Sequence, residues 1–208
     1  MTTESNPTIL SDDELLRRLR GGDEEAFLAL YRRRQGAIYR FAVRMSGSPS
    51  VAEDVTQETF MILLRGDGKY DAARGSFSAY LFGIARNQML RRLEKERGLL
   101  PLDPAGEDDA RREPESMIAA EDPLRDLTRR ETIESVRQAV LSLPPHYREV
   151  VVLCDLHEMS YQEAASVLDC AVGTVRSRLH RGRGMLVERL RGTDLAPQGG
   201  ADSVTCFV

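Results

Sequence analysis

The residues best suited to chemistry in this sequence are a cluster of basic side chains near its C-terminal end. Between Gly173 and Arg191 the chain carries six arginines and a single glutamate. The arginine side chain is a planar fork of hydrogen-bond donors that matches both guanine edges and phosphate oxygens. Ser177 and His180 in the same stretch can reach other base edges. The cluster indicates contact with a nucleic acid, and a solvated basic helix face is the alternative.

Helical spacing separates the basic side chains of this stretch from its apolar ones. The residues that share the apolar face are Val175, Leu179, Leu186 and Leu190. The opposite face is polar and lacks bulky groups, so it can enter a major groove. The expected base-reading residues are Ser177, His180 and Arg181, with Arg176 at the edge of that face. The expected phosphate-binding residues are Thr174, Arg178 and Arg183.

A short helix and a tight turn precede the basic helix. Ser160 and Glu163 have the spacing of a capping box, in which two side chains satisfy backbone amides at the start of a helix. This helix is expected to end at a turn over 169–171, and the basic helix to begin at Val172. Two helices joined in this way form the helix-turn-helix plan of many DNA-binding proteins. The plan favours DNA contact over the solvated-face alternative.

Two helices in the N-terminal half present further polar surfaces. The first begins near Val51 and displays Glu53, Asp54, Gln57, Glu58 and Met61. Its acids could also do no more than complement the positive end of the helix dipole. The second, over 78–97, places Tyr80, Asn87 and Arg91 on one stripe. An aromatic ring, an amide and an arginine together suit unpaired bases, with a solvated face again as the alternative.

The elements that position these residues predict an all-α protein. Capping-box spacing marks expected helix starts at Ser11, Ser50, Thr128 and Ser160. Residues 150–152 could form a buried strand, but the prolines just before them favour a helix. Gly182 and Gly184 each cost a helix about 1 kcal/mol, so the far end of the basic helix is expected to bend or fray.

Composition along the chain predicts two helical domains joined by a flexible acidic linker. The expected linker, 99–127, is rich in proline and acidic residues, which cannot bury much apolar surface. The expected segments are a disordered N-terminus (1–10), a first domain (11–98), the linker, a second domain (128–191) and a flexible tail (192–208).

Length and composition exclude several classes of protein. The chain has 208 residues, 41% of them hydrophobic, and a formal net charge of −4. No run approaches the roughly 18 apolar residues of a membrane span, and the N-terminus lacks the pattern of a secretory signal. Three scattered cysteines do not form a disulfide framework, and three histidines show no metal-ligand spacing. We expect a cytoplasmic protein that is not an enzyme, has no cofactor or metal, and does not insert into a membrane by itself.

Four stretches, in their order and spacing, resemble a bacterial RNA polymerase sigma factor of the sigma-70 family, extracytoplasmic-function (ECF) type. Residues 20–27 read RGGDEEAF, residues 52–60 read AEDVTQETF, and residues 77–87 read FSAYLFGIARN. The fourth stretch runs from SYQEAA at 160–165 to VGTVRSRLHR at 172–181. The resemblance covers about residues 11–98 and 128–191. Two departures are Tyr80, where the family usually has tryptophan, and Gly83, where it often has a basic residue.

This resemblance implies a four-helix region 2, a linker in place of region 3, and a region 4 that ends in a helix reading the −35 promoter element. It implies that the surface of Glu53, Asp54, Gln57, Glu58 and Met61 docks on the β′ clamp helices of core RNA polymerase, and that region 4 meets the β flap. It implies that loop 69–77 and the next helix capture the −10 strand of promoter DNA. The residues expected there are Phe77, Tyr80, Asn87 and Arg91. The resemblance also implies control by a separate anti-sigma factor.

Two other functions are compatible with parts of the sequence. A plain transcriptional regulator would use only the helix-turn-helix and would leave the surface around Gln57 and Asn87 unexplained. A sigma-like decoy that sequesters an anti-sigma factor usually carries a receiver domain and loses DNA-reading residues, and this chain shows neither feature. The sequence therefore favours a sigma factor.

Overall fold

The computed structural model describes residues 10–66, 70–73, 75–99 and 123–191, and every regular element in these ranges is a helix. The elements are α1 (Asp12–Arg20), α2 (Glu24–Ser46), α3 (Pro49–Arg65), α4 (Phe77–Leu99), α5 (Pro123–Leu141), α6 (Pro145–Val151), the π-helical turn η1 (Val152–Leu156), α7 (Tyr161–Leu168) and α8 (Val172–Arg191). The predicted all-α class is confirmed, and residues 150–152 are helical as expected. None of the described helices has the length and apolarity needed to cross a bilayer.

Helices α1 to α4 form the first unit. Ser11, Asp23 and Ser48 cap the starts of α1, α2 and α3 by accepting hydrogen bonds from backbone amides of the first turn. Gly47 ends α2 with φ of 76°, a left-handed conformation that glycine adopts without a steric penalty. The buried side chains that hold this unit together include Leu30, Ile38, Phe41, Val55, Phe60 and Leu81.

Helices α5 to α8, with η1, form the second unit. Pro145 occupies the first turn of α6, where its missing amide hydrogen is no loss. Both hydrogen bonds of the capping box predicted for Ser160 and Glu163 are present at the start of α7. Asp169 then turns the chain with φ of 50°, and α8 begins three residues later. The expected helix, turn and helix are therefore confirmed.

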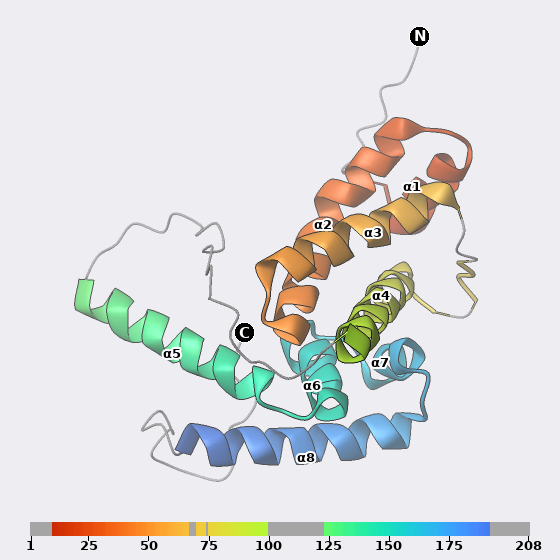
Figure 1. Ribbon diagram of the computed structural model, residues 1–208. Coiled ribbons are helices and arrows are strands. Elements are labelled where there is room, and N and C mark those ends of the chain that lie inside the picture. Colours follow the sequence, from red (N-terminus) through yellow and green to blue (C-terminus); the bar gives the residue numbers. More distant parts are fainter. Residues whose placement is uncertain (1–9, 67–69, 74, 100–122, 192–208) are drawn as a thin grey trace.

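The two units pack against each other around one continuous core. Its buried members run from Leu15 and Phe41 in the first unit to Val151 and Leu179 in the second. Figure 1 shows α4 lying beside α7, with α6 beneath the first unit and α8 along the opposite edge of the second. The sequence predicts two helical units correctly but gives no sign of this contact between them.

Several expected boundaries were wrong. The cap of α3 is Ser48, not Ser50, because Pro49 takes the first helical position. Thr128 lies inside α5, which begins at Pro123 and so extends into the predicted linker. Helix α8 continues through Gly182 and Gly184 to Arg191, so the expected fraying is not seen. Residues 1–9, 100–122 and 192–208, which carry the expected disorder of the termini and most of the linker, lie outside the described residues.

Candidate nucleic-acid and partner-binding surfaces

Helix α8 has the two faces that its sequence predicts. Val175 and Leu179 are buried against the second unit, while Arg176, Ser177, His180 and Arg181 are exposed. The described side chains opposite the core therefore form a continuous polar surface on an accessible helix. We call Arg176, Ser177, His180 and Arg181 the α8 face.

Neighbouring side chains restrain two arginines of α8. The guanidinium carbon of Arg176 lies 5.8 Å from the centre of the Tyr161 ring, within the range of a cation–π interaction. Arg183 donates two hydrogen bonds to Asp155 of η1, with Nη2–Oδ1 at 2.5 Å and Nε–Oδ2 at 3.1 Å. This pairing raises the pKa of Arg183 above its ordinary value. Arg183, expected to hold a phosphate, thus already has an intramolecular acidic partner.

Gly182 permits the close crossing of α6 and α8. An added Cβ at this position would lie 3.0 Å from Cγ2 of Val151 and 3.5 Å from the carbonyl oxygen of Tyr147. The equivalent atom at Gly184 would meet nothing within 4 Å. The sequence does not distinguish the two glycines, because their different surroundings depend on α6, more than 30 residues away.

On α3, the expected partner-binding residues share an accessible face. Glu53, Asp54, Gln57 and Met61 are exposed, and Glu58 is half-buried. Asp54 accepts a hydrogen bond from Nη1 of Arg92 at 2.8 Å, and Glu58 lies 3.8 Å from Nη1 of Arg65. The acids at 54 and 58 are therefore paired rather than without partners. We call these five residues the α3 face.

The stripe expected on α4 is only partly accessible. Asn87 and Arg91 are exposed and Tyr80 is half-buried, but Phe77 is 3% exposed. Phe77 and Tyr80 pack against Tyr70, with ring centres 5.7 and 5.3 Å from the Tyr70 ring. Burial and a 2.6 Å hydrogen bond to Asp13 raise the pKa of Tyr70 to about 12. Tyr70 was not among the expected residues, and its place in loop 69–77 was the only signal for it.

A groove lies at the N-terminal end of α4. It has a volume of about 480 Å³, and its lining residues are Asp12, Asp13, Arg33, Arg34, Ser76, Phe77, Ser78 and Glu163. Asp12 pairs with both arginines, with Arg33 Nη1 at 2.6 Å and Arg34 Nε at 2.6 Å. Among the lining residues that the structure describes, Glu163 is the one contributed by the second unit. We call this site the α4 groove.

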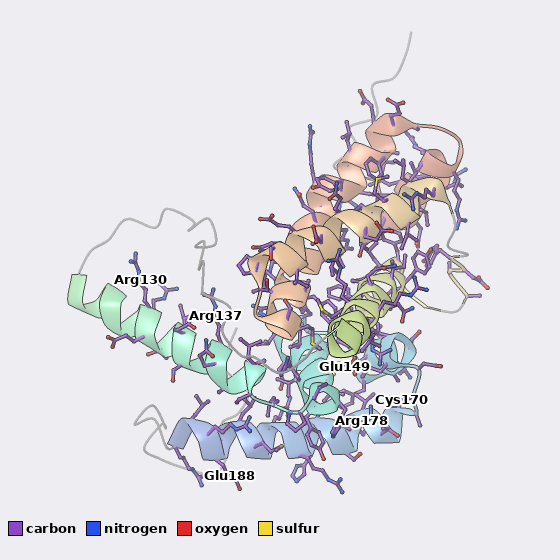
Figure 2. The ribbon with its side chains drawn as sticks, viewed as in Figure 1. Arg130, Arg137, Glu149, Cys170, Arg178 and Glu188 are labelled. Carbon is purple, nitrogen blue, oxygen red and sulfur yellow. The ribbon has the colours of Figure 1, made fainter. Side chains whose placement is uncertain are left out.

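Polar contacts across the junction of the units reinforce the shared core. Arg86 of α4 pairs with Glu149 of α6, and Figure 2 shows Glu149 where α6 approaches α4. Arg148 donates to the carbonyl oxygen of Met45 at 2.6 Å, near the end of α2. The His157 ring packs against the rings of Phe41 and Phe82. Burial, together with the charges of Arg44 and Arg40, lowers the pKa of His157 to about 3.

The two helical units match two regions of one known protein family. Residues 30–98 match the model of Sigma-70 region 2, and residues 133–186 match that of Sigma-70, region 4. These ranges fall on the first and second helical units respectively. The class of protein defined by the fold is therefore the sigma-70 family.

Individual relatives narrow the family to its ECF type. The ECF RNA polymerase sigma factor SigE of Mycolicibacterium smegmatis is 37% identical over 81% of this chain and 64% of its own length. SigW of Bacillus subtilis, also an ECF sigma factor, is 32% identical over 85% of this chain and 95% of its own length. A solved structure of CnrH, in complex with the cytosolic domain of CnrY, superposes with a TM-score of 0.64 at 27% identity, covering 87% of this chain and 97% of CnrH. The chain belongs to the ECF sigma factors of the sigma-70 family.

Proposed function

We propose that this protein binds core RNA polymerase and directs it to promoters that carry a −10 and a −35 element. The observation that carries the proposal is that regions 2 and 4 coincide with two units that each present an accessible polar helix face. The protein supplies recognition, and the polymerase performs the chemistry. The proposal places the chain in the cytoplasm, with the transcription machinery.

Each surface has a role in this proposal. The α3 face binds the β′ clamp helices, with Gln57 and Met61 as its accessible centre and flanking acids held by Arg92 and Arg65. Asn87, Arg91 and Tyr80 of α4 contact the −10 strand. The α8 face enters the major groove of the −35 element, and the remainder of region 4 meets the β flap.

The exposed side chains of α8 support direct reading of base edges. Arg181 offers two parallel donors to guanine, whereas Ser177 and His180 are shorter and reach one base edge each. Tyr161 holds Arg176 at the edge of the α8 face, where it can contact a base or a phosphate. Arg178 and Thr174, at the start of the helix, suit phosphate oxygens.

A protein partner that controls access to these surfaces is part of the proposal. CnrH was solved bound to the cytosolic domain of a second protein, CnrY. We propose that an anti-sigma factor binds this chain in a comparable way and covers the α3 face.

Assembly with polymerase tests the proposal directly. The purified chain is mixed with core RNA polymerase, and complexes are separated by size-exclusion chromatography and weighed by native mass spectrometry. One copy of the chain bound per core enzyme is the expected result. Failure to bind core, with the chain folded by circular dichroism, would refute the proposed function.

A further inference from the structure

The α4 groove contains a carboxylate that reaches it from the other helical unit. Glu163 belongs to α7, whereas the remaining lining residues come from α1, α2 and the start of α4. Ser76 Oγ donates a hydrogen bond to Oε1 of Glu163 at 2.7 Å. This bond and those from Ser160 lower the pKa of Glu163, so its side chain carries a negative charge at neutral pH.

We propose that Glu163 occupies the position of a DNA phosphate in the α4 groove and thereby keeps single-stranded DNA out of it. The inference rests on the proposed −10 role of this end of α4. A carboxylate and a phosphodiester are both anionic acceptors for a serine hydroxyl, so one excludes the other at Ser76. In this arrangement the hydroxyl group of Ser76 already donates its hydrogen bond to Glu163. An incoming DNA strand therefore meets a carboxylate in the groove.

The charges around Glu163 strengthen the exclusion. Arg33 and Arg34 are the cations among the described lining residues, and both are paired with Asp12. Asp13, also in the lining, accepts a hydrogen bond from the hydroxyl group of Tyr70. With Glu163 in place, a phosphate entering the groove meets a described lining that holds three acids and two bases.

Release of Glu163 requires α7 to move as part of its unit. The Glu163 side chain is fixed to the start of α7, because its Oε2 accepts hydrogen bonds from Ser160 N at 3.1 Å and from Ser160 Oγ at 2.8 Å. The packing of α4 against α7 and the Arg86–Glu149 pair hold the units together. Separation of the units therefore withdraws the carboxylate and uncovers Ser76 in one motion. Binding to polymerase, which engages both units, is the event that would separate them.

The test compares Glu163→Gln with the wild-type full-length chain in the absence of polymerase. Glutamine keeps the capping box and removes the charge. The probe is a fluorescein-labelled pool of random single-stranded 12-nucleotide DNA, and fluorescence anisotropy is recorded over a series of salt concentrations. We expect Glu163→Gln to bind about two- to fivefold more tightly. We also expect its salt slope to steepen by no more than about 0.7, the value for one phosphate neutralised by a cation on single-stranded DNA, because loss of the Glu163 charge lets a phosphate approach Arg33 and Arg34.

A matched control separates this local effect from the change in net charge. Glu188→Gln makes the same charge change on an exposed residue near the C-terminal end of α8, which Figure 2 shows at the end of the helix remote from α7. It should leave both affinity and salt slope close to wild type. Urea unfolding of both variants establishes that each is folded under the binding conditions.

The outcomes distinguish this inference from the proposed function. If Asn87→Ala and Arg91→Ala weaken binding of the same probe but Glu163→Gln leaves affinity and slope unchanged, the −10 role stands and the Glu163 inference is wrong. An equal gain from Glu188→Gln also overturns the inference. If the Asn87 and Arg91 variants have no effect on promoter-strand binding in the polymerase complex, the −10 role itself fails.

Discussion

Arg86 of α4 and Glu149 of α6 form a buried ion pair at the junction of the two helical units, with Nε of Arg86 2.7 Å from Oε1 of Glu149. The two side chains are 19% and 6% exposed. The residues are 63 positions apart, and neither belongs to a surface proposed to bind DNA or polymerase. The pair therefore links region 2 to region 4 and makes the arrangement of the units a testable property.

Removing one member of this pair should destabilise the protein strongly. Glu149→Ala leaves the partly buried Arg86 guanidinium without its partner, and the loss should approach the value of about 3–5 kcal/mol that is typical of fully buried pairs. The double change Arg86→Leu with Glu149→Leu removes both charges and should lose much less. Urea unfolding of the three proteins measures the difference. A double variant that loses as much stability as Glu149→Ala would show that an unpartnered Arg86 is not what destabilises the single variant.

Substitution by alanine should lower the stability of the protein at Gly182 and raise it at Gly184. Gly182→Ala places a methyl group against Val151 at the crossing of α6 and α8, and overpacking of this kind costs about 1–3 kcal/mol. Gly184→Ala meets no neighbour and gains helix propensity, so it should stabilise by up to about 1 kcal/mol. Thermal unfolding compares the two variants with wild type. Destabilisation by Gly184→Ala would contradict the open surroundings of that position.

Burial of His157 should make stability depend on pH. Its pKa is about 3 in the fold and 6.5 when solvated, so the unfolded chain binds more protons between these values. The contribution is fully present above about pH 6.5 and decreases as pH falls below it, by at most about 1.4 kcal/mol per pH unit. Urea unfolding near pH 7.5 and pH 5.5 should therefore show a loss in wild type that is smaller in His157→Gln. Equal losses in the two proteins would mean that His157 does not control this dependence.

The polymerase dock should be sensitive to a positive charge introduced at its accessible centre. Gln57→Arg places a cation on the exposed part of the α3 face and should weaken binding of core polymerase. Stability should change by no more than about 0.5 kcal/mol, as for most exposed positions. Glu24→Arg, an exposed change at the start of α2, is a control for altered charge. Normal pull-down of polymerase by Gln57→Arg would argue against this surface.

Alanine variants of Arg181 and Arg183 should differ in their effect on the choice of −35 sequence. Arg181→Ala removes an exposed guanidinium from the α8 face, which should relax preference at one −35 position with a loss of about 1–3 kcal/mol. Arg183 lies outside the α8 face and is paired with Asp155, so Arg183→Ala removes only a general positive charge, which should lower affinity for all sequences alike and leave preference unchanged. Binding of the wild type and both variants to a randomised −35 library at two salt concentrations measures both effects. A change in preference from Arg183→Ala alone would mean that the recognition helix is rotated from the orientation proposed.

Local signals in the sequence predicted the helices and the α8 face well. The Ser160–Glu163 spacing located the start of α7, and the period of Val175 and Leu179 separated the buried face of α8 from its polar face. Such features depend on residues within a few turns of one another, so they can be derived from spacing alone. Ser50 failed as a cap because Pro49 fixes an earlier start, a competition that could have been recognised in the sequence.

Contacts between distant segments could not be derived in the same way. Nothing near Glu149 indicates that Arg86 is its partner, and nothing near Asp54 indicates Arg92. Phe77 was expected to meet DNA because of its place in a motif, yet its 3% exposure reflects packing against Tyr70. Gly182 was expected to weaken its helix, whereas its small size allows the approach of α6. Each of these properties depends on how the helices pack.

Promoter-specific initiation is the central claim, and runoff transcription tests it most directly. Core RNA polymerase is combined with the purified chain and a genomic promoter library, and the 5′ ends of the transcripts are sequenced. The account predicts discrete start sites that share a −10 and a −35 motif, with Arg181→Ala altering only the −35 motif. Transcripts no different from those of core polymerase alone, from a chain that binds core, would contradict it.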